Sequence, residues 1–351
     1  MTIRIGVIGA GVIGRLRAMT IASSPSTTLA AVCDVVPGLA ASAAGSAPAV
    51  GDLDAFFAHP MDAVVISSPV HLHEEAAVRA FALGLHVLCE KPMSNTAESC
   101  RRMTDAAAAA RRVLAVGFNL RYYPAIKYAR DVVDAGLIGD VDHVRLFGGH
   151  DGLANFRADW QYRAPESGAG ATMDVGIHLS DLGRHFLGDI TEVSGVASGA
   201  VWQVPGSEDN ALAVFRSPAG IGASYQATWN EWRGYEVAIE VYGRLGMVRG
   251  SYAPMQNVLV THAAPGAPRR TVRKRYPEIM VRERLRGWQS TTRITFEEEL
   301  ADFVARIDGG AGGRLADGHD GLRSVEVSEA LRESSRRGEA IHLPPLGPLR
   351  P

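Results

Sequence analysis

The sequence predicts an α/β fold with two domains, and three observations support that prediction. The chain has 351 residues, enough for two domains of ordinary size. Through its first third, short apolar runs alternate with helix-like stretches, as in a parallel sheet covered by helices on both faces. From residue 120 onward, alternating apolar and polar residues predict a large open sheet that is mostly antiparallel. We therefore expect one domain at residues 1–119 and another at 120–351.

The first domain is built from apolar runs of strand length and from the helical stretches between them. The run "IRIGVIG" at residues 3–9 comes first, and the helical stretch "VIGRLRAMTIASS" follows it. The predicted strands are residues 3–9, 28–34, 61–69, 85–91 and 113–119, and the predicted helices are 12–24, 73–84 and 97–112.

A helix over residues 123–136 opens the second domain, and two closing helices lie within 295–337. The segment 263–289 is basic and contains prolines. We expect it to be irregular, either as a loop over a cleft or as part of a subunit contact. The remaining predictions are a helix at 173–188 and strands at 141–152, 190–202, 210–217, 222–230, 235–244 and 247–253.

Charge and cysteine usage exclude several classes of protein. The formal net charge of -2 gives no general attraction to nucleic acid or to an anionic membrane. The three cysteines, Cys33, Cys89 and Cys100, have no metal-ligand spacing, and no disulfide framework is expected. We find no secretory leader and no apolar run of membrane-spanning length. The expectation is a cytoplasmic protein with no nucleic-acid or membrane partner.

A glycine-rich turn after the first strand predicts a dinucleotide site. Gly9, Gly11 and Gly14 have the spacing Gly-x-Gly-x-x-Gly, and Val12 and Ile13 begin the following helix. Glycines allow a tight turn and a close approach of a pyrophosphate, and the helix N-terminus favours its negative charge. This pattern is typical of a Rossmann domain. The alternative is a doubly wound fold whose turn binds nothing or binds another nucleotide.

One carboxylate predicts that the cofactor is NAD. Asp34 ends the second strand, where a carboxylate can accept both ribose hydroxyls and repel a 2′-phosphate. No arginine follows it in "CDVVPG". NADP stays open as the less favoured cofactor, because Arg15 and Arg17 are basic side chains near the turn.

The lysine of "EKP" is the first candidate for chemistry. Lys91 stands at the carboxyl end of a predicted parallel strand, where open α/β sheets bind their ligands. Pro92 biases Lys91 toward an extended conformation, and Glu90 can pair with the lysine or with a ribose. The alternative is a solvated cation or a salt-bridge partner.

A second candidate set lies in "SGAGATMDVGIHLSDL". Asp174 and His178 are four residues apart, which places them on one face of the predicted helix. Gly168 and Gly170 precede this helix and would let a substrate come close. The alternatives are a solvated helix face or core histidines. No metal site is expected, because no third ligand has a familiar spacing.

These motifs together resemble the Gfo/Idh/MocA oxidoreductase superfamily. The motifs "GVIGAGVIG", "DAVVISSPVHLH", "EKP", "GFNLRYYP" and "GAGATMDVGIHLSDL" occur in the family's order and span roughly residues 3–190. The resemblance implies a Rossmann domain, an open-sheet partner domain that forms a homodimer or homotetramer, and sugar or cyclitol substrates. One departure is Leu120, where the family often has a basic or aromatic residue.

The resemblance also implies roles for individual residues. Lys91, Asp174 and His178 form its catalytic set, with His178 as the acid/base. Aromatic and acidic groups of the second domain suit sugar rings and hydroxyls, although each of them can also be structural. The residues expected to bind the cofactor are Gly9, Gly11, Val12, Ile13, Gly14, Asp34, Ser68, Pro69, His73, Glu90, Lys91 and Arg121. The residues expected to bind the substrate are Tyr122, Trp160, Asp174, His178, Trp229 and Glu231.

We therefore predict an NAD-dependent dehydrogenase that oxidises a secondary hydroxyl of a sugar, amino sugar or cyclitol to a ketone. Neutral His178 is suited to take the hydroxyl proton, and the ammonium of Lys91 stabilises the developing alkoxide. Family analogy and an Arg- and Ala-rich composition favour aminoglycoside or other sugar-containing antibiotic biosynthesis. Three alternatives stay open: reduction of a keto sugar, an NAD-using glycosidase of the same fold, and a non-catalytic NAD-binding regulator.

Overall fold

The computed structural model describes residues 2–152 and 159–345, and within them the chain forms two compact units. The first unit comprises residues 2–119 and 286–322, and the second comprises residues 120–152, 159–285 and 323–345.

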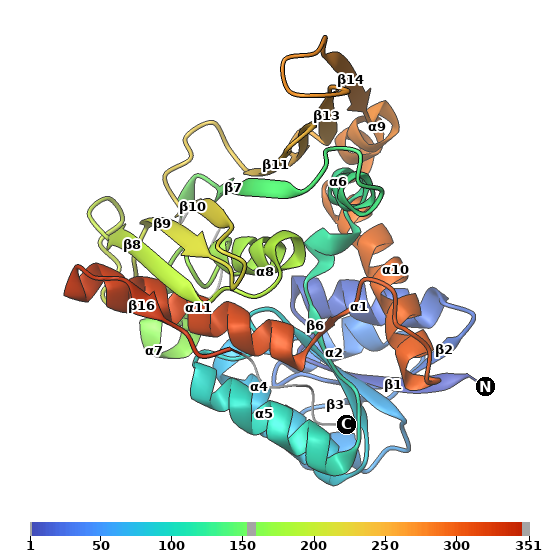
Figure 1. Cartoon of the computed structure of the whole chain (residues 1–351). Helices are drawn as coiled ribbons and strands as arrows, with labels where there is room; N and C mark the ends of the chain where they lie inside the picture. The colour runs from blue at the N-terminus through green and yellow to red at the C-terminus, as the bar shows by residue number, and fades with distance from the viewer. Residues whose placement is uncertain (1, 153–158, 346–351) are drawn as a thin grey trace. The chain divides into compact units, whose positions relative to one another are not determined.

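The first unit is built on a twisted parallel sheet with one antiparallel strand at its edge (Figure 1). The strand order β3-β2-β1-β4-β5-β6 is that of dinucleotide-binding Rossmann sheets. Its strands are β1 (Ile3–Ile8), β2 (Thr27–Cys33), β3 (Ala49–Val50), β4 (Ala63–Ile66), β5 (His86–Glu90), β6 (Leu114–Gly117) and the antiparallel β15 (Ala316–Asp317). Strands β1, β2, β4, β5 and β6 are short and largely buried apolar runs, which is why they could be read from the sequence. The two-residue strands β3 and β15 were not predicted.

Helices cover both faces of this sheet, as right-handed crossovers require. Helices α1 (Val12–Ser23), α2 (Pro37–Ala44) and α10 (Gln289–Ile307) share one apolar core with the sheet. Helices α4 (His73–Ala82) and α5 (Ala97–Ala110) pack against each other below the sheet in Figure 1. The carboxyl ends of the parallel strands thus stay open for a ligand.

Helix α10 belongs to the first unit, although the sequence analysis assigns residues 120–351 to the second domain. Its residues Leu300 and Phe303 are buried in the core that contains β1 and α1. Glu299 forms an ion pair with Arg17 of α1, with 2.6 Å between Oε2 and Nη1. Apolar periodicity predicts that a helix has a buried face, but it does not say which sheet that face covers.

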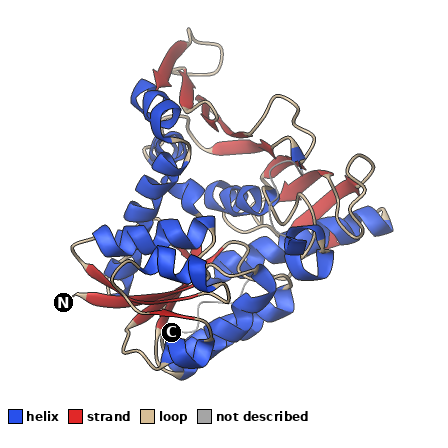
Figure 2. Cartoon of the chain, turned by 180° about the vertical axis from the view of Figure 1, so that it is seen from behind, coloured by secondary structure: helices blue, strands red, loops and turns tan. Residues whose placement is uncertain are grey.

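The second unit is built on a sheet of nine strands (Figure 2). All neighbouring strands are antiparallel except β7 and β10, which pair in parallel. The strand order is β14-β13-β12-β11-β7-β10-β9-β8-β16. The strands are β7 (Val141–Gly149), β8 (Glu192–Ser198), β9 (Asn210–Arg216), β10 (Gly222–Thr228), β11 (Glu236–Gly243), β12 (Gly246–Tyr252), β13 (Gln256–Thr261), β14 (Arg270–Arg275) and β16 (Ile341–His342).

Three helices pack on this sheet around the second apolar core: α6 (Pro124–Asp134), α8 (Gly176–Leu187) and the C-terminal part of α11 (Gly318–Arg337). Strand β9 alternates buried and exposed residues, as one covered face requires. None of the helices in the described part of the chain is long and apolar enough to cross a membrane.

The segment 263–289 is irregular over residues 263–269, and a strand and a helix follow, so the expectation of an irregular segment is wrong for most of its length. It contains β14, which pairs with β13 as a hairpin, and helix α9 (Pro277–Arg286). Strand β14 is an edge strand whose sequence RTVRKR is exposed on both faces. Charged residues on an edge prevent further strand pairing, and they also erase the alternation by which a strand is recognised.

Candidate active site

The glycine turn after β1 has the shape that a pyrophosphate needs. Gly9 has a φ of 86°, and a Cβ added there would lie 2.5 Å from backbone atoms of Ser67. A Cβ added at Gly14 would lie 1.8 Å from the carbonyl oxygen of Gly9. At Gly11 no described atom lies within 4 Å of an added Cβ, so the backbone is open to a ligand. Gly9 and Gly14 are therefore needed for close packing of the backbone, and Gly11 allows a ligand to approach the backbone.

Asp34 is fixed beside this turn. Its Oδ2 accepts a hydrogen bond from the backbone N–H of Ala10 at 2.7 Å, and its Oδ1 accepts one from Val36 at 2.8 Å. A carboxylate has about four acceptor sites, so both oxygens can still accept ribose hydroxyls. Val12 and Ile13 start α1, and the first N–H groups of a helix have no acceptor within it. These groups fit the phosphates and ribose of a dinucleotide.

Two buried serine hydroxyls mark the end of β4. Ser67 Oγ and Ser68 Oγ are inaccessible to solvent and have no hydrogen-bond partner among the described residues. Leaving such groups unsatisfied costs free energy, so a ligand that bonds to them would be favoured. Pro69 follows and caps the short 3-10 helix Val70–Leu72. The hydroxyls, the glycine turn and Asp34 all belong to the first unit and together fit NAD.

His73 is expected along the cofactor, but both of its ring nitrogens have partners within the first unit. Nε2 lies 2.8 Å from the carbonyl oxygen of Ser68. Nδ1 lies 3.1 Å from the carbonyl oxygen of Pro92 and 3.3 Å from Cys89 Sγ. Burial lowers the pKa of His73 and keeps the ring neutral. A neutral ring carries one N–H, so Nε2–H donates to the carbonyl oxygen of Ser68 and Nδ1 accepts from the thiol of Cys89. The imidazole therefore ties the segment after β4 to β5.

Lys91 follows directly on β5, at the carboxyl end of the parallel sheet. Its neighbour Glu90 is held by Arg17, with 2.6 Å between Oε1 and Nη2, and only 12% of the Glu90 side chain is exposed. Arg17 also pairs with Glu299 and is buried. The ion pair with Arg17 thus fixes the Glu90 side chain at the carboxyl end of β5. The guanidinium of Arg17 is committed to two carboxylates, which removes one of the two basic side chains that left NADP open.

Asp174 lies just before the helix rather than on it. Helix α8 begins at Gly176, and Asp174 belongs to the preceding turn. Its Oδ2 accepts hydrogen bonds from His150 Nε2 at 2.7 Å and from Trp229 Nε1 at 3.1 Å. His178 lies in the first turn of α8 and is 7% exposed. Asp174 and His178 belong to the second unit, and Lys91 belongs to the first.

His150 is a site residue that the sequence analysis missed. The backbone N–H of Gly152 donates to its Nδ1 at 3.1 Å. Nδ1 is therefore unprotonated in the neutral ring, and Nε2 carries the proton that it donates to Asp174. The available signal was its place at the carboxyl end of β7, inside the predicted strand 141–152. Nothing local in the sequence connects it with Asp174.

Aromatic residues surround the same carboxylate. The sequence analysis expects Trp229 to bind the substrate, but its side chain is only 1% exposed and cannot present its ring to a sugar. It donates to Asp174 instead. Tyr235 is 41% exposed and interacts electrostatically with Tyr123 and Asp174. Tyr123 and Tyr235 both pack edge-on against Tyr252, with ring centroids 4.9 and 5.9 Å away. Neutral phenols beside a carboxylate are suited to hydroxylated ligands.

Three other predicted residues are held within the second unit, two of them by charged partners and one by burial. Arg121, expected at the cofactor, donates from Nε to Asp181 Oδ2 at 2.9 Å, and both side chains are buried. Tyr122 is 2% exposed. Glu231 Oε1 accepts from Arg233 Nε at 2.8 Å, and this hydrogen bond lowers the pKa of Glu231. Arg121 and Tyr122 thus build the unit, and Glu231 forms an ion pair at the rim of the site.

Trp160 lies in the 3-10 helix Asp159–Tyr162, directly after the undescribed residues 153–158, and it is half-buried. It stays a candidate aromatic contact. Tyr162 is a further aromatic candidate from the sequence, and its side chain lies outside the described part of the chain.

Two family models match the chain. One is described as an oxidoreductase family with an NAD-binding Rossmann fold, and it matches residues 3–118. The other is described as a GFO/IDH/MocA C-terminal domain, and it matches residues 126–249. The two matches cover the glycine turn, Lys91, Asp174 and His178.

Individual proteins agree with these models. The chain is 30% identical to inositol 2-dehydrogenase 2 of Saccharopolyspora erythraea, over 96% of this chain and 94% of that protein. A solved levoglucosan dehydrogenase in complex with NADH has a TM-score of 0.86 at 25% identity and covers 99% of this chain and 100% of its own. GenD2 from gentamicin A biosynthesis, solved with NAD, has a TM-score of 0.81, with 98% of this chain and 97% of its own covered. Its identity is 23%, so this likeness concerns the fold alone.

Proposed function

Because the chain belongs to the GFO/IDH/MocA family of oxidoreductases, we propose that it oxidises a secondary hydroxyl of a sugar, amino sugar or cyclitol to a ketone with NAD. The observation that carries the proposal is the carboxylate of Asp174, which is partly exposed and fixed by two donors, His150 and Trp229. A partly exposed carboxylate with fixed donors is suited to orient a ring that bears several hydroxyls. Relatives named for inositol and levoglucosan support a substrate of this kind.

NAD, when bound, supplies the acceptor for the hydride. The residues that would hold it are the open backbone at Gly11, the first turn of α1, the carboxylate of Asp34 and the hydroxyls of Ser67 and Ser68. Asp34 favours NAD, because a 2′-phosphate would meet its negative charge.

The chain's own groups would handle the proton. His178 takes the proton of the substrate hydroxyl, and its neutral imidazole is well matched to that task near neutral pH. Asp174 orients the reacting ring and stabilises the cation that forms on His178. Lys91 stabilises the negative charge that develops on the substrate oxygen. A compact ammonium can also pass on a proton, which a guanidinium cannot do.

The finer part of the proposal is an amino sugar or aminocyclitol substrate of an antibiotic pathway. An ammonium group on the ring would be attracted to the carboxylate of Asp174, whereas the charge of Glu231 is already compensated by Arg233. GenD2 shares the fold, and its title names gentamicin A biosynthesis, which makes aminoglycosides worth including among the substrates tested.

The proposal is tested by following the appearance of NADH in purified protein with NAD and a panel of sugars, amino sugars, cyclitols and intact aminoglycosides. Lys91→Ala should lower kcat by about 100- to 1,000-fold. Lys91→Arg should fail nearly as badly, since arginine is larger and is never deprotonated. NAD binding by both variants is the control. Near-normal turnover by Lys91→Arg would contradict the role given to the lysine.

The same assay separates the competing reactions. Oxidation of NADH by keto sugars would show that the enzyme is a reductase. Release of an aglycone without net NADH would show an NAD-using glycosidase. A regulator would bind NAD and show neither reaction, and alanine at Lys91, Asp174 and His178 would leave its biological effect unchanged.

We further propose that the enzyme is a homodimer or homotetramer formed through the outer face of its open sheet. Val196, Leu212 and Val214 are exposed there by 61%, 44% and 59%. Val196 lies opposite Leu212 in the β8–β9 register, so the three apolar side chains form one patch. Burying such a patch between two copies is favourable.

A cytoplasmic location also belongs to this proposal. Cys33, Cys89 and Cys100 are buried and form no disulfide in the described part of the chain. Buried cysteines outside disulfides are typical of a reducing compartment.

A further inference from the structure

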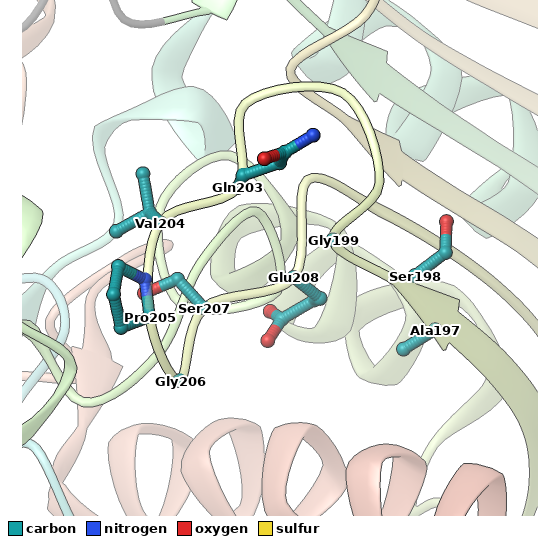
Figure 3. A pocket seen from close by; sticks show the side chains of 9 residues that line it. All are labelled: Ala197, Ser198, Gly199, Gln203, Val204, Pro205, Gly206, Ser207 and Glu208. Carbon is teal, nitrogen blue, oxygen red and sulfur yellow. The ribbon is translucent and has the colours of Figure 1, made fainter.

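The loop between β8 and β9, residues 199–209, ends in two acidic residues, Glu208 and Asp209. They are only 7% and 1% exposed. Figure 3 shows the Glu208 side chain in the middle of the loop, in the wall of a cavity of about 440 Å³. Burying a carboxylate costs folding free energy unless it is hydrogen-bonded. The hydrogen-bond partners of Glu208 and Asp209 therefore show which segments these residues stabilise.

Glu208 holds the turn that leads to Asp174. Its Oε1 accepts from the backbone N–H of Thr172 at 2.9 Å and from the Thr172 hydroxyl at 2.6 Å. Its backbone carbonyl accepts from the N–H of Ala171 at 2.8 Å. The Thr172 oxygen in turn accepts from Ser328 Oγ of α11 at 2.7 Å. The turn two residues before Asp174 is thus bonded on both sides.

Asp209 holds a second segment of the same site. Its backbone carbonyl accepts from the N–H of Trp229 at 2.7 Å. Its Oδ2 accepts from the N–H groups of Val201 and Trp202 at 2.8 and 2.9 Å. The indole of Trp202 then donates to the carbonyl oxygen of Trp229 at 3.1 Å. Glu208 and Asp209 are adjacent in sequence. Through these hydrogen bonds they hold the two segments that carry Asp174 and Trp229.

These contacts close a ring, because Trp229 Nε1 donates to Asp174 Oδ2 at 3.1 Å. We propose that Glu208 is a positioning residue which, together with Asp209, fixes Asp174 against Trp229 and His150 and so sets where the substrate ring binds. The inference rests on the proposed function, since it takes Asp174 to face the substrate. Glu208 acts through the turn, and no contact between Glu208 and the substrate is part of the proposal.

Two variants at Glu208 separate positioning from general stability. Glu208→Gln keeps an oxygen that can accept from Thr172, and Glu208→Ala removes it. The matched control is Glu326→Ala in the same unit. Glu326 is equally buried, at 7% exposed, and it pairs with Arg323 at 2.9 Å rather than with the Asp174 turn. Both alanine variants should lower the Tm.

The first measurement is hydrogen–deuterium exchange of the full-length protein, which needs no substrate. In Glu208→Ala, amides in the peptide that covers residues 170–176 should exchange faster by about tenfold or more. In Glu326→Ala and Glu208→Gln the same peptide should exchange as in the wild type. Wild-type exchange in Glu208→Ala would overturn the proposal.

The second measurement is the steady-state kinetics with the best substrate of the panel. A shift of the Asp174 turn by a fraction of an ångström should lower kcat/KM of Glu208→Ala by about 10- to 100-fold, with NAD binding unchanged. Glu208→Gln should keep most of the wild-type value. A loss no larger than that of Glu326→Ala would overturn the positioning role. If no substrate turned over at all, the proposed function would fail, and the exchange result would still decide whether Glu208 holds the turn.

Discussion

His73 should make the stability of the first unit depend on pH. Its burial lowers its pKa below the ordinary value of 6.5. As the pH falls through that value, the unfolded chain takes up a proton that the folded chain resists, so acid favours unfolding. The stability contributed by neutral His73 is complete above its unfolded pKa and is lost as the pH falls toward the folded pKa.

The variant His73→Gln isolates this effect. We expect its Tm to be lower than that of the wild type near neutral pH, because the hydrogen bonds to Ser68 and Cys89 are weakened. Between about pH 7 and pH 5 the Tm of the wild type should fall more steeply, so the two curves should converge. Parallel curves would show that another group controls the acid sensitivity.

Single residues were predictable where the backbone demanded them. Gly9 and Gly14 must be glycines, because a Cβ there would lie 2.5 and 1.8 Å from backbone atoms. This steric requirement is visible in the sequence as a glycine pattern. No comparable sequence pattern identifies the hydrogen-bond partners of Asp174. His150 is 24 residues before it and Trp229 is 55 residues after it, and only the folded second unit brings them together. The residue type and spacing of Asp174 made it predictable from the sequence. Its two donors are set by the packing of the folded unit and were not predictable.

At the scale of elements, α1, β5 and α10 meet at the guanidinium of Arg17. The group lies between Glu90 and Glu299, and its Cζ is 3.5 Å from the centre of the Phe296 ring. The cluster holds one positive and two negative charges, so its members are not equivalent. Arg17→Met would leave two buried carboxylates facing each other and should cost about 3–5 kcal/mol of unfolding free energy.

Glu299→Gln is the informative partner variant. It leaves a neutral Arg17–Glu90 pair and should cost only about 1–2 kcal/mol. Urea unfolding of both variants measures the two losses. Equal losses would mean that the packing of Arg17, and not its charge, joins the three elements.

The outer face of β8 and β9 supplies a second prediction for elements. A lysine at Val214 places a charge in the apolar patch, so Val214→Lys should lower the molar mass in solution to that of a smaller assembly. Val201→Lys is the matched control, since Val201 is 52% exposed and lies in the loop beyond the patch. Analytical ultracentrifugation gives the mass, and an unchanged mass in Val214→Lys would exclude this face as the subunit contact.

The elements that escaped sequence analysis did so for physical reasons. Strand β14 is an edge strand with five exposed positions out of six, so burial imposed no alternation on it. Helix α10 was recognised as a helix, yet its apolar stripe fits any sheet of the right width. The parallel strands β1, β4 and β5 were readable because both of their faces are buried.

At the scale of the whole molecule, the first unit is discontinuous in sequence. Residues 2–119 lack α10, which carries Glu299 and the core residues Leu300 and Phe303. A fragment of residues 1–119 should therefore show no cooperative thermal transition and should not bind NAD. Joining it to residues 286–322 through a flexible linker should restore both, as circular dichroism and NAD titration can show. Cooperative unfolding of the short fragment would contradict this division of the chain.

The discontinuity also has a consequence for biosynthesis. Residues up to 119 leave the ribosome roughly 170 residues before α10 begins at Gln289. At about 5–20 residues per second, the nascent sheet waits on the order of 10–30 s before the helix that covers it exists. During that interval the apolar face of β1 and α1 lacks Leu300 and Phe303, and Arg17 has only Glu90 of its two carboxylate partners. The nucleotide-binding unit is thus the first to begin synthesis, yet its core stays incomplete until α10 has been made.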